Sequence, residues 1–375
     1  MKRIVLLGAG LVGQAIARDL AGEYDLWVLD IDSERLKSLQ ADRGIRTAVA
    51  DARDREILRK MLENADLAIN ALPGSLGTGA SRDIIETGVH LVDIAFSPED
   101  PFDLHDLALA HDVTAVVDCG VAPGLSNLIL GHHHRLMDHI DSFECLVGGL
   151  PKERKWPGEY KAGFSPADVV EEYVRPARFV ENGVQVVRPA LSDPEYVHFP
   201  GLATLESFNT DGLRTLIRTM DIPNMKEKTL RYPGHIQLMG ALRELGFFAQ
   251  DPVTVRGIAV APREFTSRIL FPHWELKEGE ADFTCMRVSL SGVEGGRPKT
   301  IEYNLYDEYD PETRTSSMAR TTGYTCTAVA RLVLAGRFKR RGICPPEYLG
   351  EEEGLFETVV EEIGHRGVRL ESTFK

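Results

Sequence analysis

The feature that most constrains this 375-residue chain is a glycine-rich turn between an apolar run and a helical pattern near its start. The apolar run over residues 3–7 leads into Gly8, Gly10 and Gly13, and Asp30 closes the next apolar run. Gly8 permits a tight turn, Gly10 lets a pyrophosphate approach backbone N–H groups, and Gly13 lets the helix lie close to the strand. In this strand–turn–helix context, the spacing predicts a dinucleotide-binding site.

The acidic residue after the second apolar run selects between the two nicotinamide dinucleotides. Asp30 can accept hydrogen bonds from both adenosine ribose hydroxyls and would repel a 2′-phosphate, so the sequence favours NAD over NADP. Arg35 lies a little further along the chain, and its positive charge could bind a 2′-phosphate. It keeps NADP open as an alternative.

Strand and helix patterns alternate six times before about residue 118. This alternation predicts an α/β fold, a Rossmann-type doubly wound parallel sheet. Ligands of such sheets lie at the carboxyl ends of the strands, so polar residues that end strands are site candidates. The predicted strands lie near Ile4, Trp27, Ala48, Ala68, Leu91 and Ala115, and the polar residues that end them are Asp51, Asn70, Asp93 and Asp118.

The periodicity changes after Pro123–Gly124, where we expect a second α+β domain with a largely antiparallel sheet. Glu181-Asn182-Gly183 separates two β-rich runs and predicts a hairpin, as does the segment 293–297. The irregular segment 151–163 is expected to expose Trp156 and Tyr160. The predicted division is 1–124 for NAD binding, with 316–350 packing back onto it, 125–315 for substrate binding and dimerisation, and 351–375 as a C-terminal tail.

The composition limits which binding partners and which cellular compartment are expected. The net charge of −14 and pI near 5.3 argue against nucleic acid or an anionic membrane and favour a small molecule. No apolar run approaches the roughly 20 residues of a membrane span, and the chain enters a strand at once, so we expect a cytoplasmic protein. The five cysteines have no C-x-x-C pair, which suits a reducing compartment and gives no zinc spacing.

Three consecutive histidines, His132 to His134, follow a helix-like apolar run. Neighbours in a helix point about 100° apart, so these rings cannot converge on one ion. The sequence therefore favours a solvated helix end over a metal site, and we expect no metal.

Six segments together resemble the saccharopine dehydrogenase-like family, and most of all its L-lysine 6-dehydrogenase branch. The resemblance implies an NAD-dependent oxidoreductase acting on a C–N bond, with a discontinuous first domain. After Asp93 the chain departs from lysine dehydrogenases, which tend to carry a glycine pair where residues 94–99 stand. Other branches join two amino acids through a reduced imine. The six segments are 8–13, 70–73, 118–127, 205–212, 228–235 and 318–324.

The resemblance and the strand ends together give a predicted cofactor site. In the resembling family the backbone of 70–73 contacts the ribose and nicotinamide side, although a proline-marked turn alone would also explain it. The predicted cofactor contacts are Gly8, Gly10, Leu11, Val12, Gly13, Asp30, Asp51, Ala52, Asn70, Ala71, Leu72, Pro73 and Gly120.

An amino-acid substrate brings a carboxylate, which a bidentate arginine holds best. Arg231 is the first candidate, although a strand arginine more often faces water. Asn209 and Thr210, before Asp211, could bind the α-amino and carboxylate groups or could cap a helix. Asp211 and Tyr160 complete the predicted substrate-binding set.

Three residues are candidates for the proton acceptor. His235 titrates near neutral pH and follows a Pro-Gly turn that could present it to a cleft, although a lone histidine at a helix start is more often structural. Asp118 and Asp93 end strands at the ligand edge of the sheet, and either could instead cap a turn.

These observations predict oxidative deamination of the side-chain amine of L-lysine or a close analogue, giving a semialdehyde, ammonia and NADH. One alternative is a saccharopine-type reductase acting on an imine between an amino acid and an oxo acid. Another is a non-catalytic NAD-binding sensor. A homodimer is expected, since it is the commonest symmetric assembly.

Overall fold

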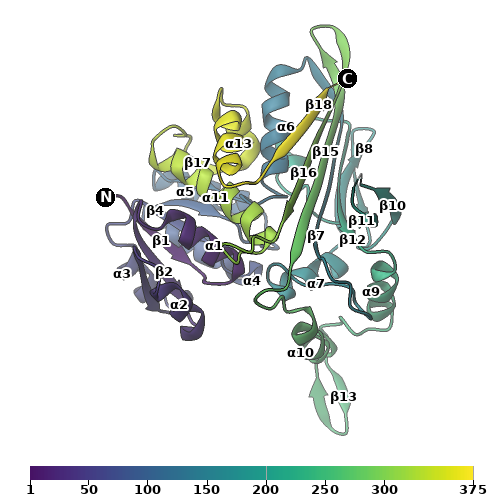
Figure 1. Ribbon diagram of the computed structural model, residues 1–375, viewed down its shortest axis with the longest axis horizontal. Coiled ribbons are helices and arrows are strands. Elements are labelled where there is room, and N and C mark those ends of the chain that lie inside the picture. The colour runs from purple at the N-terminus through teal and green to yellow at the C-terminus, as the bar shows by residue number, and fades with distance from the viewer. Residues whose placement is uncertain (200, 375) are drawn as a thin grey trace. The chain divides into compact units, whose positions relative to one another are not determined.

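The computed structural model describes residues 1–199 and 201–374 (Figure 1). The chain divides into two compact units, each built from separate stretches of sequence. The first comprises Met1–Ile140, Gly292–Lys299 and Met318–Leu370, and the second comprises Asp141–Ser291, Thr300–Ser317 and Glu371–Lys375.

The first unit contains a seven-stranded parallel sheet in the order β17-β6-β5-β4-β1-β2-β3. All six predicted strands are confirmed. The seventh strand, β17, was not predicted, because it is three residues long and comes from far along the sequence. The strands are β1 Arg3–Leu7, β2 Asp25–Asp30, β3 Ile45–Val49, β4 Leu67–Asn70, β5 His90–Asp93, β6 Thr114–Val116 and β17 Gly342–Cys344.

Some helices of the first unit begin where a polar side chain satisfies free backbone N–H groups. Asp32 accepts hydrogen bonds at the start of α2, and Asp54 does the same for α3. The helices are α1 Leu11–Leu20, α2 Ser33–Gln40, α3 Arg55–Leu62, α4 Gly74–Ile85, the 3-10 helix η1 Pro101–Leu104, α5 His105–Ala110, α6 Leu125–Leu136, α11 Ser317–Leu334, α12 Pro346–Gly350 and α13 Leu355–His365.

An ion-pair network joins the beginning of the first unit to its end. Asp19 on α1 accepts a hydrogen bond from Arg331 Nη1 of α11 at 2.9 Å and another from Arg366 Nε, just after α13. Glu23 pairs with Arg331 at 2.8 Å. The Asp19 side chain is only 10% exposed. These ion pairs hold the segment after residue 318 against α1 of the first unit.

The boundary of the first unit differs from the predicted one. Helix α6 belongs to it, because α12 packs against α6 so closely that a Cβ on Gly131 would lie 2.0 Å from the carbonyl oxygen of Glu347. The expectation of a solvated end at His132 and His133 is wrong for the same reason. Both rings are buried, and His132 stacks on Phe356 of α13 at 4.3 Å between ring centroids.

The second unit contains a mixed sheet in the order β10-β11-β12-β7-β15-β16-β18, which β8 and β9 extend beside β12. The pair β7–β12 is parallel, whereas β11–β12 and β8–β9 are antiparallel. The predicted hairpin at 181–183 is confirmed. The strands are β7 His139–Pro151, β8 Ala177–Glu181, β9 Val184–Arg188, β10 Glu195–His198, β11 Thr204–Asn209, β12 Asn224–Arg231, β15 Asp282–Glu294, β16 Arg297–Glu308 and β18 Leu370–Phe374.

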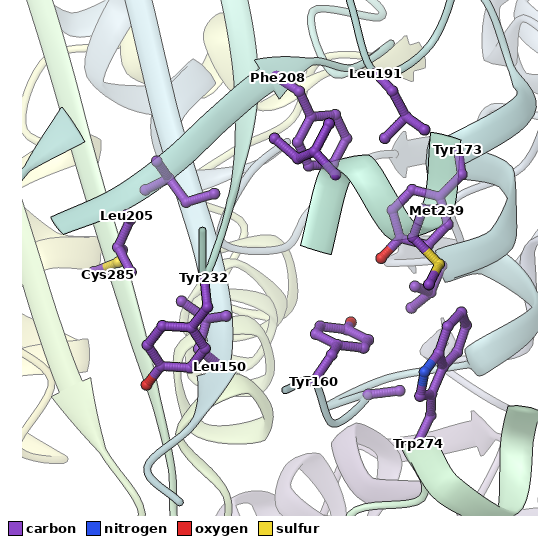
Figure 2. Packing of buried hydrophobic residues seen from close by; sticks show 14 of the residues in the cluster. Leu150, Tyr160, Tyr173, Leu191, Leu205, Phe208, Tyr232, Met239, Trp274 and Cys285 are labelled. Carbon is purple, nitrogen blue, oxygen red and sulfur yellow. The ribbon is translucent and has the colours of Figure 1, made fainter. Parts of the chain in front are cut away.

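Helices of the second unit pack aromatic side chains onto this sheet. Figure 2 shows part of the resulting core, where Tyr160, Tyr173 and Trp274 lie near one another. A separate two-stranded hairpin, β13–β14, is exposed along most of its length. The elements are α7 Pro166–Val174, α8 Leu216–Thr219, α9 His235–Glu244, α10 Pro262–Trp274, β13 Val253–Val255 and β14 Ile258–Val260.

Two general properties follow from the described residues. All five cysteines are buried free thiols, so no disulfide joins them. Among residues 1–199 and 201–374, no helix has the length and apolar character needed to cross a bilayer.

Candidate functional site

The glycine turn after β1 has the close approaches that the sequence predicted. Gly8 has a φ of +100°, and a Cβ there would lie 2.5 Å from the carbonyl oxygen of Ala71. A Cβ on Gly13 would lie 2.1 Å from the carbonyl oxygen of Gly8. A Cβ on Gly10 would meet nothing within 4 Å. Gly8 and Gly13 therefore pack the turn, and the backbone at Gly10, before Leu11 and Val12 open α1, is left open to a ligand.

Asp30 is fixed beside this turn. Its carboxylate is 8% exposed and accepts hydrogen bonds from the backbone N–H groups of Ala9 at 2.6 Å and Asp32 at 2.8 Å. A carboxylate oxygen has a further lone pair for a hydroxyl donor. Arg35 forms an ion pair with Asp32 at 3.4 Å. The residues therefore fit a dinucleotide whose ribose carries free hydroxyl groups.

Asp51 follows β3, with Ala52 in the adjoining turn. Its carboxylate is paired with the guanidinium of Arg53, whose Nη2 lies 2.7 Å away. Hydrogen bonds from Arg53 lower the pKa of Asp51 to about 2. The carboxylate is thus an anion whose charge a neighbouring cation already balances.

Asn70 ends β4 and holds the turn that follows it. Its Nδ2 donates to the carbonyl oxygen of Gly77 at 3.1 Å and to Ser81 Oγ at 3.0 Å, and its Oδ1 accepts from the N–H of Leu72 at 3.3 Å. These bonds fix the backbone of Ala71, Leu72 and Pro73 against the start of α4. The backbone that the resemblance assigns to the nicotinamide side is therefore rigid.

Two acidic residues follow the neighbouring strands β5 and β6. Asp93 is 6% exposed and accepts from Ser81 Oγ at 2.5 Å and from the N–H of Ala95 at 2.7 Å. Burial, together with the nearby charge of Asp118, raises the pKa of Asp93 to about 7. Asp118 is buried with a φ of +52°, a left-handed conformation that is uncommon for residues other than glycine. The structure thus brings two predicted proton acceptors close together.

Gly120 lies in the loop after Asp118. Its N–H donates to the carbonyl oxygen of Pro123 at 3.0 Å, and a Cβ on Gly120 would lie 3.3 Å from the Thr322 methyl group of α11. The segments 118–127 and 318–324, far apart in sequence, therefore pack together within the first unit.

Arg231 ends β12 in the second unit and is engaged by its own neighbours. It is 2% exposed, and its guanidinium donates to Glu172 Oε2 at 2.5 Å, to the carbonyl oxygen of Leu230 at 2.9 Å and to Tyr173 Oη at 3.3 Å. Glu172 balances its charge. The predicted bidentate grip on a substrate carboxylate would have to displace these contacts.

His235 begins α9 in the interior rather than at a cleft. It is 4% exposed, its Nδ1 lies 2.8 Å from the carbonyl oxygen of Gly158, and its Nε2 lies 2.9 Å from Tyr173 Oη. A carbonyl oxygen only accepts, so Nδ1 carries the proton and Nε2 accepts from Tyr173. Burial and Arg231 lower the pKa of His235 to about 3. This arrangement argues against His235 as the proton acceptor.

Tyr160 was expected to be exposed, and that expectation is wrong. It is 5% exposed, whereas Trp156 is 85% exposed. The guanidinium carbon of Arg231 lies 4.4 Å from the Tyr160 ring centroid, and Trp274 packs edge-on at 5.6 Å. A stacked cation and buried rings hold the phenol in place, and nothing in the local sequence indicates them.

The polar residues at the end of β11 and directly after it are hydrogen-bonded to side chains from other segments of the second unit. Asn209 Nδ2 donates to Asp193 Oδ2 at 2.8 Å, and the hydroxyl groups of Thr210 and Thr229 lie 3.0 Å apart. Asp211 accepts two hydrogen bonds from the Arg178 guanidinium, at 2.8 and 2.9 Å. The capping alternative is not observed for these residues, since the next helix, α8, begins at Leu216.

The sequence reasoning missed Glu172 and Tyr173, which lie in α7. They contact Arg231, which is 58 or more residues away in the chain, so no local motif marks them. Ser81 was missed for a similar reason. In the part of the chain that the structure describes, no three histidine, cysteine or acidic side chains are grouped so that they could hold a metal ion.

Comparison with known proteins gives two family matches that together span most of the chain. The saccharopine dehydrogenase NADP binding domain matches residues 4–116, and the saccharopine dehydrogenase C-terminal domain matches residues 120–368.

Curated relatives are distant. The chain is 28% identical over 217 residues to alpha-aminoadipic semialdehyde synthase of Arabidopsis thaliana, which covers 54% of this chain and 20% of that protein. It is 24% identical over 266 residues to saccharopine dehydrogenase [NADP(+), L-glutamate-forming] of Saccharomyces cerevisiae, which covers 67% of this chain and 59% of that protein. The match therefore spans less than two thirds of either relative.

Among solved structures, the apo saccharopine dehydrogenase (L-Glu forming) from Saccharomyces cerevisiae aligns with a TM-score of 0.80. The alignment covers 100% of both chains at 18% sequence identity. At that identity the likeness shows the fold alone.

Proposed function

The chain belongs to the saccharopine dehydrogenase family, and we propose that it is an NAD-dependent dehydrogenase that oxidatively deaminates the side-chain amine of L-lysine or a close analogue. The products are the semialdehyde, ammonia and NADH. An assembly of two copies is part of this proposal, and sizing chromatography tests it.

The choice of NAD rests on Asp30. Its carboxylate is buried beside the glycine turn, and a 2′-phosphate at that position would meet a negative charge at short range. The yeast relative is named for NADP(+), so cofactor preference is where this chain is proposed to differ from it.

The choice of substrate rests on the charge pairing of three cations in the second unit, which is the observation that carries the proposal. Arg231 pairs with Glu172, Lys228 with Glu195 and Arg178 with Asp211. A saccharopine-type substrate carries the carboxylates of two amino acids, and each requires a cation or several donors. A substrate with a single carboxylate, such as lysine, needs fewer.

The reaction requires a neutral amine, a hydride acceptor close to the C–H bond, and water delivered to the imine carbon. Bound NAD supplies the hydride acceptor. Asp93 and Asp118 are the proposed proton acceptors, because they follow adjacent strands at the ligand edge of the sheet. The pKa of Asp93, raised to about 7, suits a group that takes and returns a proton near neutral pH.

A saccharopine-type reductase is the second candidate, and the yeast relative named for saccharopine favours it. Such an enzyme would consume reduced cofactor when given an aldehyde together with glutamate.

Absorbance at 340 nm separates the two candidates. NADH formation with NAD and lysine alone is the expected result, with NADP as the cofactor control. NADH consumption with aminoadipate semialdehyde plus glutamate, and no reaction with lysine alone, would overturn the deamination proposal in favour of the reductase.

A further inference from the structure

Three tyrosines, Tyr160, Tyr173 and Tyr232, lie in the aromatic core of the second unit (Figure 2). They differ in what their hydroxyl groups bind. Tyr173 Oη lies 2.9 Å from His235 Nε2 and accepts from Arg231 Nε at 3.3 Å. Tyr232 Oη donates to the carbonyl oxygen of Pro151 at 2.9 Å. Within residues 1–199 and 201–374, the Tyr160 hydroxyl makes no hydrogen bond. It is therefore available to a ligand.

The Tyr160 hydroxyl also reaches the surface of the unit. The residue keeps 5% of its area exposed. The buried side-chain oxygen and nitrogen atoms that have no hydrogen-bond partner do not include its oxygen, so this oxygen is accessible to solvent. A buried polar group is normally hydrogen-bonded, so an open and uncommitted hydroxyl on an otherwise buried ring is a feature that requires an explanation.

The ring that carries this hydroxyl is held from several sides. Arg231 stacks over it at 4.4 Å, and the His235 and Trp274 rings lie at centroid distances of 5.3 and 5.6 Å. Arg231 is itself fixed by Glu172 and Tyr173. A donor held by packing loses little freedom when it binds, which favours its use for recognition.

Burial raises the pKa of Tyr160 above its ordinary value, so the phenol stays protonated at neutral pH and acts as a donor rather than a base. Arg231, by contrast, already has its charge balanced by Glu172. The natural target of a neutral, fixed O–H donor beside a guanidinium is a carboxylate oxygen.

We propose that the Tyr160 hydroxyl binds the carboxylate of the amino-acid substrate, and that Arg231 positions the Tyr160 ring instead of gripping the carboxylate itself. This inference rests on the proposed function, in that the substrate is an amino acid.

The test compares Tyr160→Phe with the wild type. The variant keeps the ring and its stacking but lacks the donor. Loss of a hydrogen bond to a charged group predicts a KM for lysine roughly tenfold to a hundredfold higher, with kcat within about twofold. Tyr232→Phe is the matched control, since its hydroxyl bonds only a backbone carbonyl group, and its KM for lysine should equal that of the wild type.

Pentane-1,5-diamine, which is lysine without its carboxylate, sharpens the test. Measured as a competing ligand, it should bind Tyr160→Phe and the wild type equally. An unchanged KM for lysine in Tyr160→Phe, or an equal loss of affinity for lysine and for the diamine, would overturn the assignment.

Calorimetry of amino-acid binding to the wild-type enzyme in the presence of NADH distinguishes the failure of this inference from the failure of the proposed function. If the wild type binds an amino acid other than lysine and does not oxidise lysine, the proposed function fails. The assignment of Tyr160 to the carboxylate then stands if Tyr160→Phe binds that amino acid roughly tenfold to a hundredfold more weakly than the wild type does. The assignment fails if the affinity is unchanged.

Discussion

The two units use their polar residues in different ways. In the first unit the predicted site is largely backbone: the turn at Gly10 is open, Asn70 fixes the turn after β4, and Asp30 is anchored by N–H groups. In the second unit the predicted binding residues act through side chains, and most of these are bonded to other side chains of the same unit, as Arg231 is to Glu172. A site made of backbone depends on local geometry, whereas a site made of side chains depends on which distant partners occupy them.

The largest effect on stability is expected from a substitution that removes one charge of a buried ion pair in the second unit. Glu172→Ala leaves the Arg231 guanidinium, whose side chain is 3% exposed, without its carboxylate. Removing one partner of a buried pair costs about 3–5 kcal/mol of unfolding free energy. Urea denaturation measures this loss, and the affinity for NAD should change by less than about twofold if the effect stays within the second unit.

The control for that experiment is Glu244→Ala. Glu244 pairs with Arg243 in the same unit, but its side chain is 74% exposed, so its removal should cost less than about 1 kcal/mol. Equal losses from the two variants would show that burial does not distinguish the pairs.

The next largest expected effect is a dependence of the unfolding free energy on pH, caused by His235. Its pKa is about 3 in the folded protein against about 6.5 in the unfolded chain. The unfolded state therefore binds the extra proton first, so the stability that neutral His235 contributes is complete above pH 6.5 and is lost as pH falls toward 3. At about 1.4 kcal/mol per pH unit, the loss between pH 6.5 and 5 is about 2 kcal/mol.

His235→Gln lacks this titration. The difference in unfolding free energy between the wild type and His235→Gln should shrink as the pH is lowered from 6.5 to 5. A difference that stays constant over that range would mean that His235 is not held neutral in the folded protein.

Asp30→Asn probes the first unit with a smaller expected effect. The variant weakens the acceptor for the ribose hydroxyl groups and removes the charge that repels a 2′-phosphate, so the dissociation constant for NAD should rise about tenfold and the preference over NADP should narrow. Fluorescence titration with NADH and NADPH measures both. Asp32→Asn, which keeps a helix-capping side chain, is the control and should leave NADH affinity unchanged.

The smallest effect is expected at Asp51. Its side chain is only partly exposed and is already paired with Arg53, so Asp51→Asn should weaken the binding of NAD by about twofold. A tenfold loss would give Asp51 a role equal to that of Asp30.

The sequence was most informative where structure is local. Six strands of the first sheet, the glycine turn and the hairpin at 181–183 follow from periodicity and turn chemistry over short windows. The position of β17, the burial of Tyr160 and the pairing of Arg231 with Glu172 depend on contacts between distant segments. The motif containing Arg231 was recognisable, but the motif does not reveal whether the guanidinium faces a ligand or its own fold.

The discontinuity of the first unit also bears on how the protein is made. Asp19 emerges from the ribosome early, yet its partners Arg331 and Arg366 are 312 and 347 residues further along the chain. At about 5–20 residues per second, the segment around Asp19 waits tens of seconds for them, and the stretches Asp141–Ser291 and Thr300–Ser317 of the second unit are synthesised in between. A nascent chain arrested before residue 331 would therefore leave the face of α1 that carries Asp19 without the arginines that pair with it in the folded protein.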